Sequence, residues 1–195
     1  MTARDPQSMV RFSLFPTQLG DCGIAWRQDT VVATSLPDTS SVETSRRLAT
    51  RTDAVKGEPP PAIQRAIVSM TELLEGERPD LSYISCEFSG LDAFAIDVYA
   101  ATRDIPPGET QTYGSIALQI GNKQLAQSVG QALGRNPFPI IVPCHRVVGA
   151  KDKLTGFSAN GGIETKLRML AIEGAQIGET PGLFADLPLA VKPKR

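Results

Sequence analysis

Three short β-prone runs near the N-terminus, at residues 12–15, 23–26 and 30–35, constrain the fold of this chain more than any other feature. Turn-forming residues separate the first run from the second, at Pro16 and Gly20-Asp21, and the second from the third, at Arg27-Gln28-Asp29. Leu36-Pro37-Asp38 follows the third run and ends the meander. Short strands joined by such close turns predict a small antiparallel meander.

Two helices and one further strand are predicted after the meander. Residues 40–54 are polar with widely spaced apolar positions, which is typical of a surface helix, and a loop follows at 56–61. Apolar residues recur at helical spacing over 62–74, which predicts a second helix. One more strand is expected around 83–88. Strands followed by peripheral helices form an α+β module.

Two short helices around a glycine are predicted in the second half of the chain. Thr112 can cap a helix over 113–120, Gly121 makes a turn, and Asn122 can cap a second helix over 123–133. This pattern predicts a helix-turn-helix, whose second helix enters a DNA groove in many DNA-binding proteins. Spacing alone leaves a simple helical hairpin in a core as the alternative.

The predicted fold class is therefore α+β: a small N-terminal antiparallel-sheet module followed by a mostly helical domain that contains the helix-turn-helix and a reactive cysteine. We place the N-terminal α+β module at 1–90, the second domain at 91–175 and a C-terminal tail at 176–195. A helix through 94–99 opens the second domain. The end of the tail, 188–195, is expected to be frayed.

Charge is distributed unevenly along a chain whose formal net charge is only -1. Residues 1–110 carry 10 Lys and Arg against 16 Asp and Glu, whereas residues 111–170 carry 7 basic residues against 2 acidic ones. A basic second half is typical of a surface that faces phosphate groups. From charge alone, chance clustering on a solvated face stays open.

Three cysteines and a single histidine limit the chemistry of the chain. Cys22, Cys86 and Cys144 lie far apart, so we expect neither a disulfide framework nor a four-ligand zinc site. Cys22 and Cys86 fall in predicted strands, where buried, unreactive roles are expected. No apolar run approaches about eighteen residues and no signal-type segment opens the chain, so we expect a cytoplasmic protein without a membrane span.

The segment 136–148 places His145, the only histidine, directly after Cys144. A thiol attacks only as a thiolate, and a neighbouring imidazole and guanidinium are expected to lower its pKa. The apolar run before Cys144 predicts a buried strand, where sequence neighbours point to opposite sides, so His145 would reach Cys144 through a water or a sharp bend. Glu173, in a helix predicted over 165–173, is a candidate to orient the imidazole. Chemistry alone leaves a catalytic pair and a buried, unreactive pair equally open.

The block Pro143-Cys144-His145-Arg146-Val147 resembles the signature of the O6-alkylguanine-DNA alkyltransferases, the methylated-DNA–protein-cysteine methyltransferases. Five further blocks are similar to that family in order and spacing: Thr112-Tyr113-Gly114, Val129-Gly130, Asn136-Pro137, Gly156-Phe157-Ser158 and 166–173. The resemblance runs over residues 94–175, and the N-terminal module fits the variable domain of the family.

The resemblance implies a DNA-repair protein that acts once. Such a protein binds double-stranded DNA containing O6-alkylguanine through the helix-turn-helix in the minor groove and rotates the damaged nucleotide out of the stack. It then transfers the alkyl group to its own cysteine, which inactivates it, and it needs no cofactor and no metal. The choice among O6-methylguanine, O4-methylthymine and bulkier adducts stays open. A cytoplasmic monomer, associated with the nucleoid when on DNA and without an obligatory protein partner, is expected.

Residue roles also follow from the resemblance. Cys144 is the implied nucleophile, His145 its water-mediated base and Glu173 the group that orients the imidazole. Tyr113 would donate a proton towards the leaving purine, and Asn136 would brace the segment between recognition helix and active site.

The lesion and its DNA are expected to contact a second set of residues. Ser158 would hydrogen-bond near O6 from a lid loop, and the backbone carbonyl of Val147 would receive the exocyclic amine. Arg146 is expected to brace the site rather than to react. The remaining expected substrate or DNA contacts are Thr112, Lys123, Gln127, Arg135 and Phe157.

Two departures from the family pattern concern the DNA interface. Gln127 stands where the family usually has an arginine that enters the base stack, so the positive charge and the planar fork of donors are lost. This change predicts weaker flipping or an altered lesion preference, and Lys123 offsets only the charge. The lid has Phe157 where many members have tyrosine, and two more residues before its glycines, which predicts room for larger alkyl groups.

Three other functions compete with alkyl transfer. An alkyltransferase-like protein would sense the lesion without transfer, but such proteins characteristically replace the nucleophile, and Cys144 is present. A Cys-His hydrolase would need an oxyanion hole and an acyl intermediate. A helix-turn-helix regulator with an inert thiol would bind DNA independently of damage. A sensor with a zinc-binding phosphotriester domain is excluded because the cysteines for it are missing.

Overall fold

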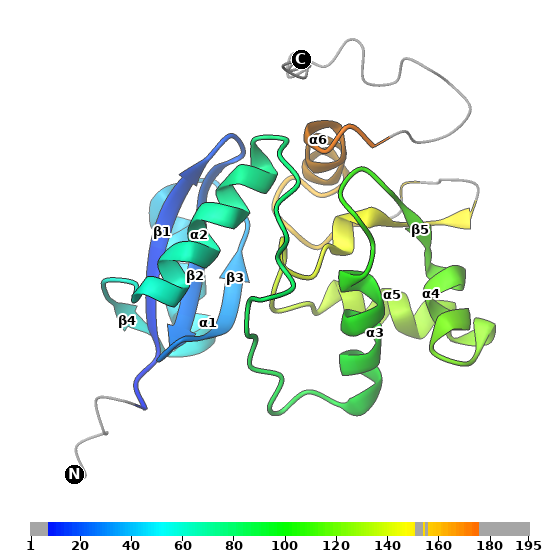
Figure 1. Cartoon of the computed structure of the whole chain (residues 1–195), viewed down its shortest axis with the longest axis horizontal. Helices are drawn as coiled ribbons and strands as arrows, with labels where there is room; N and C mark the ends of the chain where they lie inside the picture. Colours follow the sequence, from blue (N-terminus) through cyan, green and yellow to red (C-terminus); the bar gives the residue numbers. More distant parts are fainter. Residues whose placement is uncertain (1–7, 151–153, 155, 176–195) are drawn as a thin grey trace.

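The computed structural model describes residues 8–150, 154 and 156–175. The predicted tail at 176–195 and its frayed end lie outside the described residues, as do Lys151 and Lys153 of the basic segment. Within the described residues the order of elements matches an α+β fold, with the strands concentrated in the first part and helices dominating the second (Figure 1). The predicted fold class is confirmed.

A four-stranded sheet with strand order β3-β2-β1-β4 forms the N-terminal part. Strands β1 (Arg11–Thr17), β2 (Gly20–Arg27) and β3 (Thr30–Ser35) are antiparallel neighbours, which confirms the predicted meander. The two-residue strand β4 (Val55–Lys56) pairs in parallel with β1, at the start of the loop expected over 56–61.

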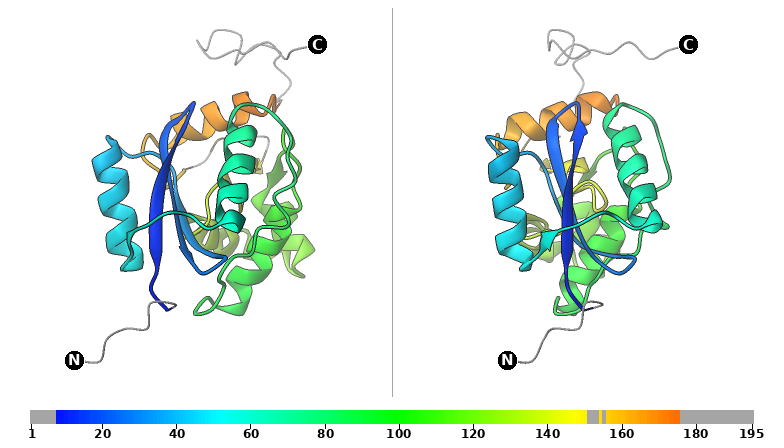
Figure 2. Two further views of the ribbon diagram at one scale, coloured as in Figure 1. Left: turned by 60° about the vertical axis from the view of Figure 1, so that its left-hand side comes forward. Right: turned by 90° about the vertical axis from the view of Figure 1, so that its left-hand side faces the viewer.

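Helices cover both faces of this sheet (Figure 2). Helix α1 (Ser41–Thr52) lies against one face and begins at Ser40, whose hydroxyl accepts a hydrogen bond from the Glu43 amide. Helix α2 (Pro61–Leu74) lies against the other face. Because side chains alternate across a strand, β2 supplies Ala25 to the α1 side and its even-numbered neighbours, Cys22 among them, to the α2 side.

The strand predicted around 83–88 is absent, and this prediction was wrong. A single bridge joins Cys86 to Val31, with the Val31 amide donating to Ser85 and the Glu87 amide donating to Val31. The carbonyl oxygens just before this bridge accept hydrogen bonds from the Arg103 guanidinium. Its Nη2 donates to the carbonyl oxygens of Leu81, Ser82 and Ile84.

The second part is helical, as predicted. Its elements are α3 (Ala93–Arg103), α4 (Tyr113–Gln119), the 3-10 turn η1 (Lys123–Leu125), α5 (Ala126–Gly134) and α6 (Ile163–Ile172).

The predicted pair of helices around Gly121 is present. Thr112 caps α4 by accepting a hydrogen bond from the Ser115 amide, and Gly121 has a φ of 107°, which a residue with a side chain rarely adopts. Asn122 accepts from the Gln124 amide, so it caps η1 rather than an α-helix. The recognition helix proper therefore begins at Ala126, three residues later than predicted.

The strand predicted before Cys144 is also wrong, since residues 139–142 form a turn and a bend. The Asn136 side chain closes this loop, with Nδ2 donating to the Val142 carbonyl and Oδ1 accepting from the Phe138 amide, each at 2.9 Å. Three prolines between Asn136 and Cys144, at 137, 139 and 143, lack the amide that a sheet ladder needs. Buried Ile140 has a φ of 79°, a strained conformation for a β-branched residue.

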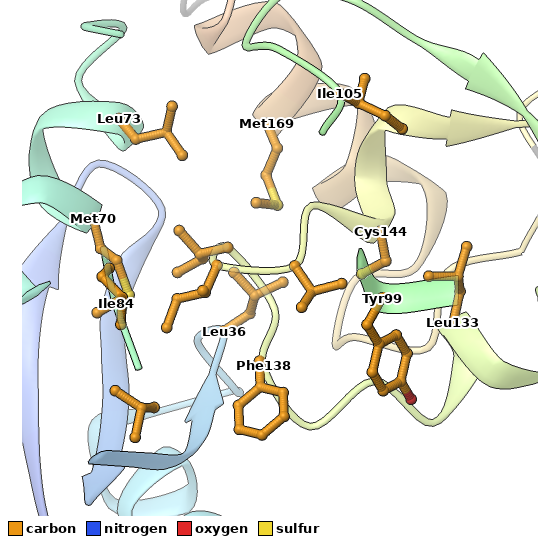
Figure 3. Close-up of a cluster of buried hydrophobic side chains, with 14 of the residues drawn as sticks. Leu36, Met70, Leu73, Ile84, Tyr99, Ile105, Leu133, Phe138, Cys144 and Met169 are labelled. Carbon is orange, nitrogen blue, oxygen red and sulfur yellow. The ribbon is translucent and has the colours of Figure 1, made fainter. Parts of the chain in front are cut away.

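One hydrophobic cluster joins the two parts of the chain. It includes Leu36 after the meander, Met70 of α2, Phe138 of the loop and Met169 of α6. Cys144 lies among these side chains (Figure 3). The division at residues 90 and 91 stays a prediction. Across the described ranges, no helix is long and apolar enough to cross a membrane.

Candidate active site

Cys144 forms part of the wall of a cavity of about 270 Å³. It is the first residue of the 3-10 helix η2 (Cys144–Arg146), and 8% of its surface is exposed. Among the residues predicted to form the site, the cavity brings together Cys144, Asn136, Arg135, Phe157 and Ser158. The thiol is therefore buried but opens onto this cavity, which Phe157 and Ser158 of the predicted lid also line.

A buried network of hydrogen bonds centres on Glu173. Its Oε1 lies 2.8 Å from Nε2 of His145, and both side chains are almost fully buried. Arg146 donates to both carboxylate oxygens at 2.9 Å and to the carbonyl of Ile105 at 2.5 Å. The Gly108 amide also donates to Oε2. The expected contact between Glu173 and His145 thus exists, and Arg146 clamps the carboxylate from the other side.

The charges in this network are set by burial and by these bonds. Burial alone would raise the pKa of Glu173, but His145 and the two bonds from Arg146 outweigh it and hold the pKa at about 2. Burial lowers the pKa of His145 below its usual value, although Glu173 opposes this shift. Near pH 7 the carboxylate is therefore ionised and the imidazole is neutral.

The carboxylate also fixes the position of the imidazole proton. Ionised Glu173 can only accept hydrogen bonds, so Nε2 of His145 must carry the proton. A neutral ring has one proton, which leaves a lone pair on Nδ1. Nδ1 is buried and has no hydrogen-bond partner among residues 8–150, 154 and 156–175. An unpaired buried acceptor next to a cysteine is a candidate general base.

The electrostatics of Cys144 differ from the sequence prediction. Burial raises the pKa of the thiol, whereas a lowering by the neighbouring imidazole and guanidinium was expected. The reason is that His145 and Arg146 both turn towards Glu173. The groups that favour the thiolate are the Asn136 side chain, the Lys166 charge and backbone amides. A base is thus needed to take the thiol proton.

Lys166 belongs to the site, although no role was predicted for it from the sequence. It is fully buried, and its Nζ donates to the Val147 carbonyl at 2.6 Å and lies 5.9 Å from the centre of the Tyr113 ring. Burial lowers its pKa to about 8, an effect that nearby Cys144 opposes. The available signal was a lysine at helical spacing from Met169 and so on the apolar stripe of α6.

A short parallel sheet connects the start of the helix-turn-helix to the cysteine segment. Strand β5 (Gln111–Thr112) pairs with β6 (Val147–Val148), so Thr112 lies opposite Val148. Tyr113 follows at the start of α4 and packs against Gly130 of α5, where a methyl group would lie 3.7 Å from the ring. The Val147 carbonyl already accepts from Lys166, and a carbonyl oxygen has a second lone pair for another donor.

Lys123 and Gln127 lie apart from this cavity, exposed on η1 and α5. Helix α5 contains no charged residue. Arg135 follows it as the C-terminal cap and is exposed at the cavity.

The part of the chain that the structure describes holds no cluster of three or more His, Cys, Asp or Glu side chains suited to bind a metal ion.

Known proteins resemble this chain in sequence and in fold. The family model described as 6-O-methylguanine DNA methyltransferase, DNA binding domain, matches residues 93–175. A methylated-DNA–protein-cysteine methyltransferase of Methanosarcina acetivorans is 50% identical over 82 residues, which cover 42% of this chain and 51% of that relative. The protein of the same name from Methanothermobacter thermautotrophicus is 31% identical over 157 residues, or 80% of this chain and 81% of that relative.

The crystal structure of Mycobacterium tuberculosis OGT in complex with DNA matches with a TM-score of 0.69 and 33% identity, over 84% of this chain and 92% of that one. The paired helices around Gly121, with a thiol buried behind them, define a helix-turn-helix protein built around a cysteine centre. Because the M. thermautotrophicus relative matches over four fifths of its length, the family is established. The chain belongs to the methylated-DNA–protein-cysteine methyltransferases.

Proposed function

We propose that this protein repairs DNA by direct reversal, moving the alkyl group of O6-alkylguanine to its own Cys144. The family supports the reaction, and the relative whose structure contains DNA supports a DNA partner. The observation that carries the assignment of residues is the free Nδ1 of His145, whose other nitrogen is held by Glu173 beside a buried thiol.

The reaction begins with the thiol proton. One water between Cys144 and His145 passes this proton to Nδ1, and ionised Glu173 stabilises the imidazolium that forms. The thiolate then attacks the alkyl carbon, so that an S–C bond forms while the C–O6 bond breaks and its electron pair stays on the guanine. Lys166 favours the thiolate by its charge. The thioether has no good leaving group, so each molecule reacts once.

The purine leaves as an anion and needs a proton or a compensating charge. Tyr113, at the start of α4, is the proposed proton donor. Asn136 holds the loop before Cys144, and Ser158 with Phe157 forms the lid side of the cavity. The Val147 carbonyl is the proposed acceptor for the exocyclic amine.

A methyl-transfer experiment tests this assignment. The protein is incubated with a duplex that contains one O6-methylguanine, and its cysteine peptides are mapped by mass spectrometry. Methyl on Cys144 is expected, with none in Cys144→Ser and unchanged transfer in Cys86→Ser, a half-buried cysteine of the other part of the chain. Methyl on another cysteine would overturn the residue assignment. Tight lesion binding with no methylated cysteine would favour the alternative function of a sensor that does not transfer.

We further propose that the protein acts as a monomer in the cytoplasm, on the nucleoid when bound to DNA, without an obligatory protein partner. The small number of exposed large apolar side chains among the described residues supports a monomer: Val42, Val55, Val68, Tyr83, Leu118 and Ile163. Light scattering with size-exclusion chromatography is expected to give the mass of one chain, and a dimer mass would contradict this.

A further inference from the structure

The cavity at Cys144 is built by both parts of the chain. Asn136, Pro139 and lid residues form its wall on the side of the thiol. The remaining wall comes from the end of β3 and from α1, which contribute Thr34 and two arginines, Arg47 and Arg51. This second wall lies outside the segment at 93–175 that the family model matches.

Three arginines line this cavity: Arg47, Arg51 and Arg135. No Asp or Glu lines it among the residues for which the structure gives a position. Arg47 and Arg51 are four residues apart on α1 and so share one face of the helix. Asp38, which lies outside the cavity, accepts from Arg47 at 3.1 Å, and the Arg47 side chain remains 57% exposed.

Backbone contacts hold Arg51 against the active-site loop. Its Nη2 donates to the Thr34 carbonyl at 2.6 Å. Thr34 in turn donates from its hydroxyl to the Pro139 carbonyl at 2.6 Å and from its amide to Pro137. The position of the guanidinium is therefore tied to the loop that carries Cys144.

One carboxylate, Asp38, offsets the charge of Arg47, whereas Arg51 is held by a backbone carbonyl. Neighbouring like charges on one helix face repel each other. Partial burial and the Arg47 charge both lower the pKa of Arg51. Two cations held side by side at the entrance of a reactive cavity are suited to a negatively charged group of a ligand.

The recognition helix lacks the charge that DNA binding needs. Binding of a duplex depends on neutralising its phosphates with Lys and Arg. Helix α5 has none, and its exposed face carries Gln127 and Gln131. Glutamine suits hydrogen bonding to bases in the minor groove. The phosphate contacts must therefore come from neighbouring elements.

We propose that Arg47 and Arg51 of α1, together with Arg135, bind a phosphate of the DNA strand that carries the lesion, next to the extruded nucleotide. This inference rests on the proposed function, because it assumes that the nucleotide enters the cavity of Cys144. The N-terminal module thus belongs to the DNA-binding surface, and its arginines replace charge that Gln127 does not provide.

The salt dependence of DNA binding tests this proposal. The affinity for a duplex with one O6-methylguanine, and for the same duplex undamaged, is measured between low and moderate salt. The double variant Arg47→Gln/Arg51→Gln is expected to bind more weakly, with a log–log salt slope shallower by about 1 for each phosphate that the variant no longer neutralises. The matched control is Arg46→Gln on the same helix, since Arg46 is exposed, pairs with Glu43 and does not line the cavity.

The variants also separate a binding role from a structural one. Arg47→Lys/Arg51→Lys keeps both charges and is expected to keep the slope. Arg47→Gln alone removes one charge and the ion pair with Asp38, and it leaves the bond from Arg51 to Thr34 intact, so it serves if the double variant has a lower unfolding temperature. Slopes of all the glutamine variants equal to those of the wild type and of Arg46→Gln would overturn the proposal.

Two further outcomes have distinct meanings. An unchanged slope, combined with a selective loss of transfer from O6-carboxymethylguanine relative to O6-methylguanine, would show that the arginines bind an anionic alkyl group, and would refute phosphate binding. If the wild type forms no methylcysteine, the proposed function fails. In that case, the salt slope measured on undamaged DNA still decides whether these arginines contact phosphate.

Discussion

Replacement of Glu173 by glutamine perturbs the active site at the group that holds it together. The carboxylate accepts from His145, twice from Arg146 and from the Gly108 amide. Glutamine has nearly the same shape, but it has no charge and presents an amide donor where only donors surround it. Arg146 then remains buried without its counter-charge.

The loss of stability expected for Glu173→Gln can be calculated in two ways. The pKa of Glu173 is held at about 2 against a usual 4.5, and a shift of that size corresponds to about 3 kcal/mol at neutral pH. Removing one partner of a buried ion pair costs about 3–5 kcal/mol. Both routes predict that Glu173→Gln lowers the free energy of unfolding at pH 7 by about 3 kcal/mol.

The pH dependence of this difference follows from the sign of the shift. A carboxyl whose pKa is depressed on folding stabilises the fold above its unfolded pKa, and this stabilisation is lost as the pH falls through the folded value. The wild type should thus lose its advantage over Glu173→Gln between a pH of about 4.5 and about 2. The buried, neutral His145 adds its own loss as the pH falls below 6.5.

Urea unfolding at a series of pH values, followed by circular dichroism, measures this difference. The control is Glu164→Gln, which removes an exposed carboxylate from the first turn of the same helix and should change stability by less than about 0.5 kcal/mol. A Glu173→Gln protein within about 1 kcal/mol of the wild type at pH 7, or a difference independent of pH, would refute the reasoning.

Three further predictions concern the reaction and the DNA interface. Lys166→Met removes the ammonium near Cys144 and should slow single-turnover methyl transfer about tenfold at pH 7, with less loss at higher pH; an unchanged rate at every pH would contradict its electrostatic role. Asn136→Ala removes two bonds to the loop before Cys144 and should lower the free energy of unfolding by about 2 kcal/mol in urea titrations, whereas a loss under about 0.5 kcal/mol would show that other contacts hold the loop. Gln127→Arg restores the fork of donors on the exposed face of α5 and should speed methyl transfer at limiting DNA; transfer no faster than in the wild type would remove Gln127 from the account.

Local sequence patterns predicted most elements of the fold, because those elements depend on nearby residues. Turn residues between β-prone runs predicted the meander, and the cap Thr112 predicted helix α4. The cap Asn122 predicted a helix in the right region, but it caps η1, and α5 begins at Ala126. The strand expected at 83–88 is reduced to a single bridge between Cys86 and Val31, and Arg103, from a distant helix, binds the Ile84 carbonyl and two carbonyls that precede the predicted segment. The strand before Cys144 failed because prolines and the Asn136 side chain close that segment into a loop.

Contacts between distant segments limited the prediction of the site. The pairing of His145 with Glu173 was expected, but the effect of burial on the Cys144 thiol was not, because burial depends on the assembled core. Lys166 gave a weak local signal as a lysine on an apolar stripe. Arg47 and Arg51 of α1 gave no local signal, because they reach the cavity only through the folding of the whole chain.

The stoichiometry of methyl transfer tests the central claim most directly. Intact mass of the wild type is recorded after incubation with an excess of duplex containing one O6-methylguanine, with Cys144→Ser as control. We expect a single addition of about 14 Da on every active molecule, none on the control, and no further repair by the methylated protein. A protein that demethylates many duplexes per molecule, or repairs them without gaining mass, would contradict transfer to its own thiol.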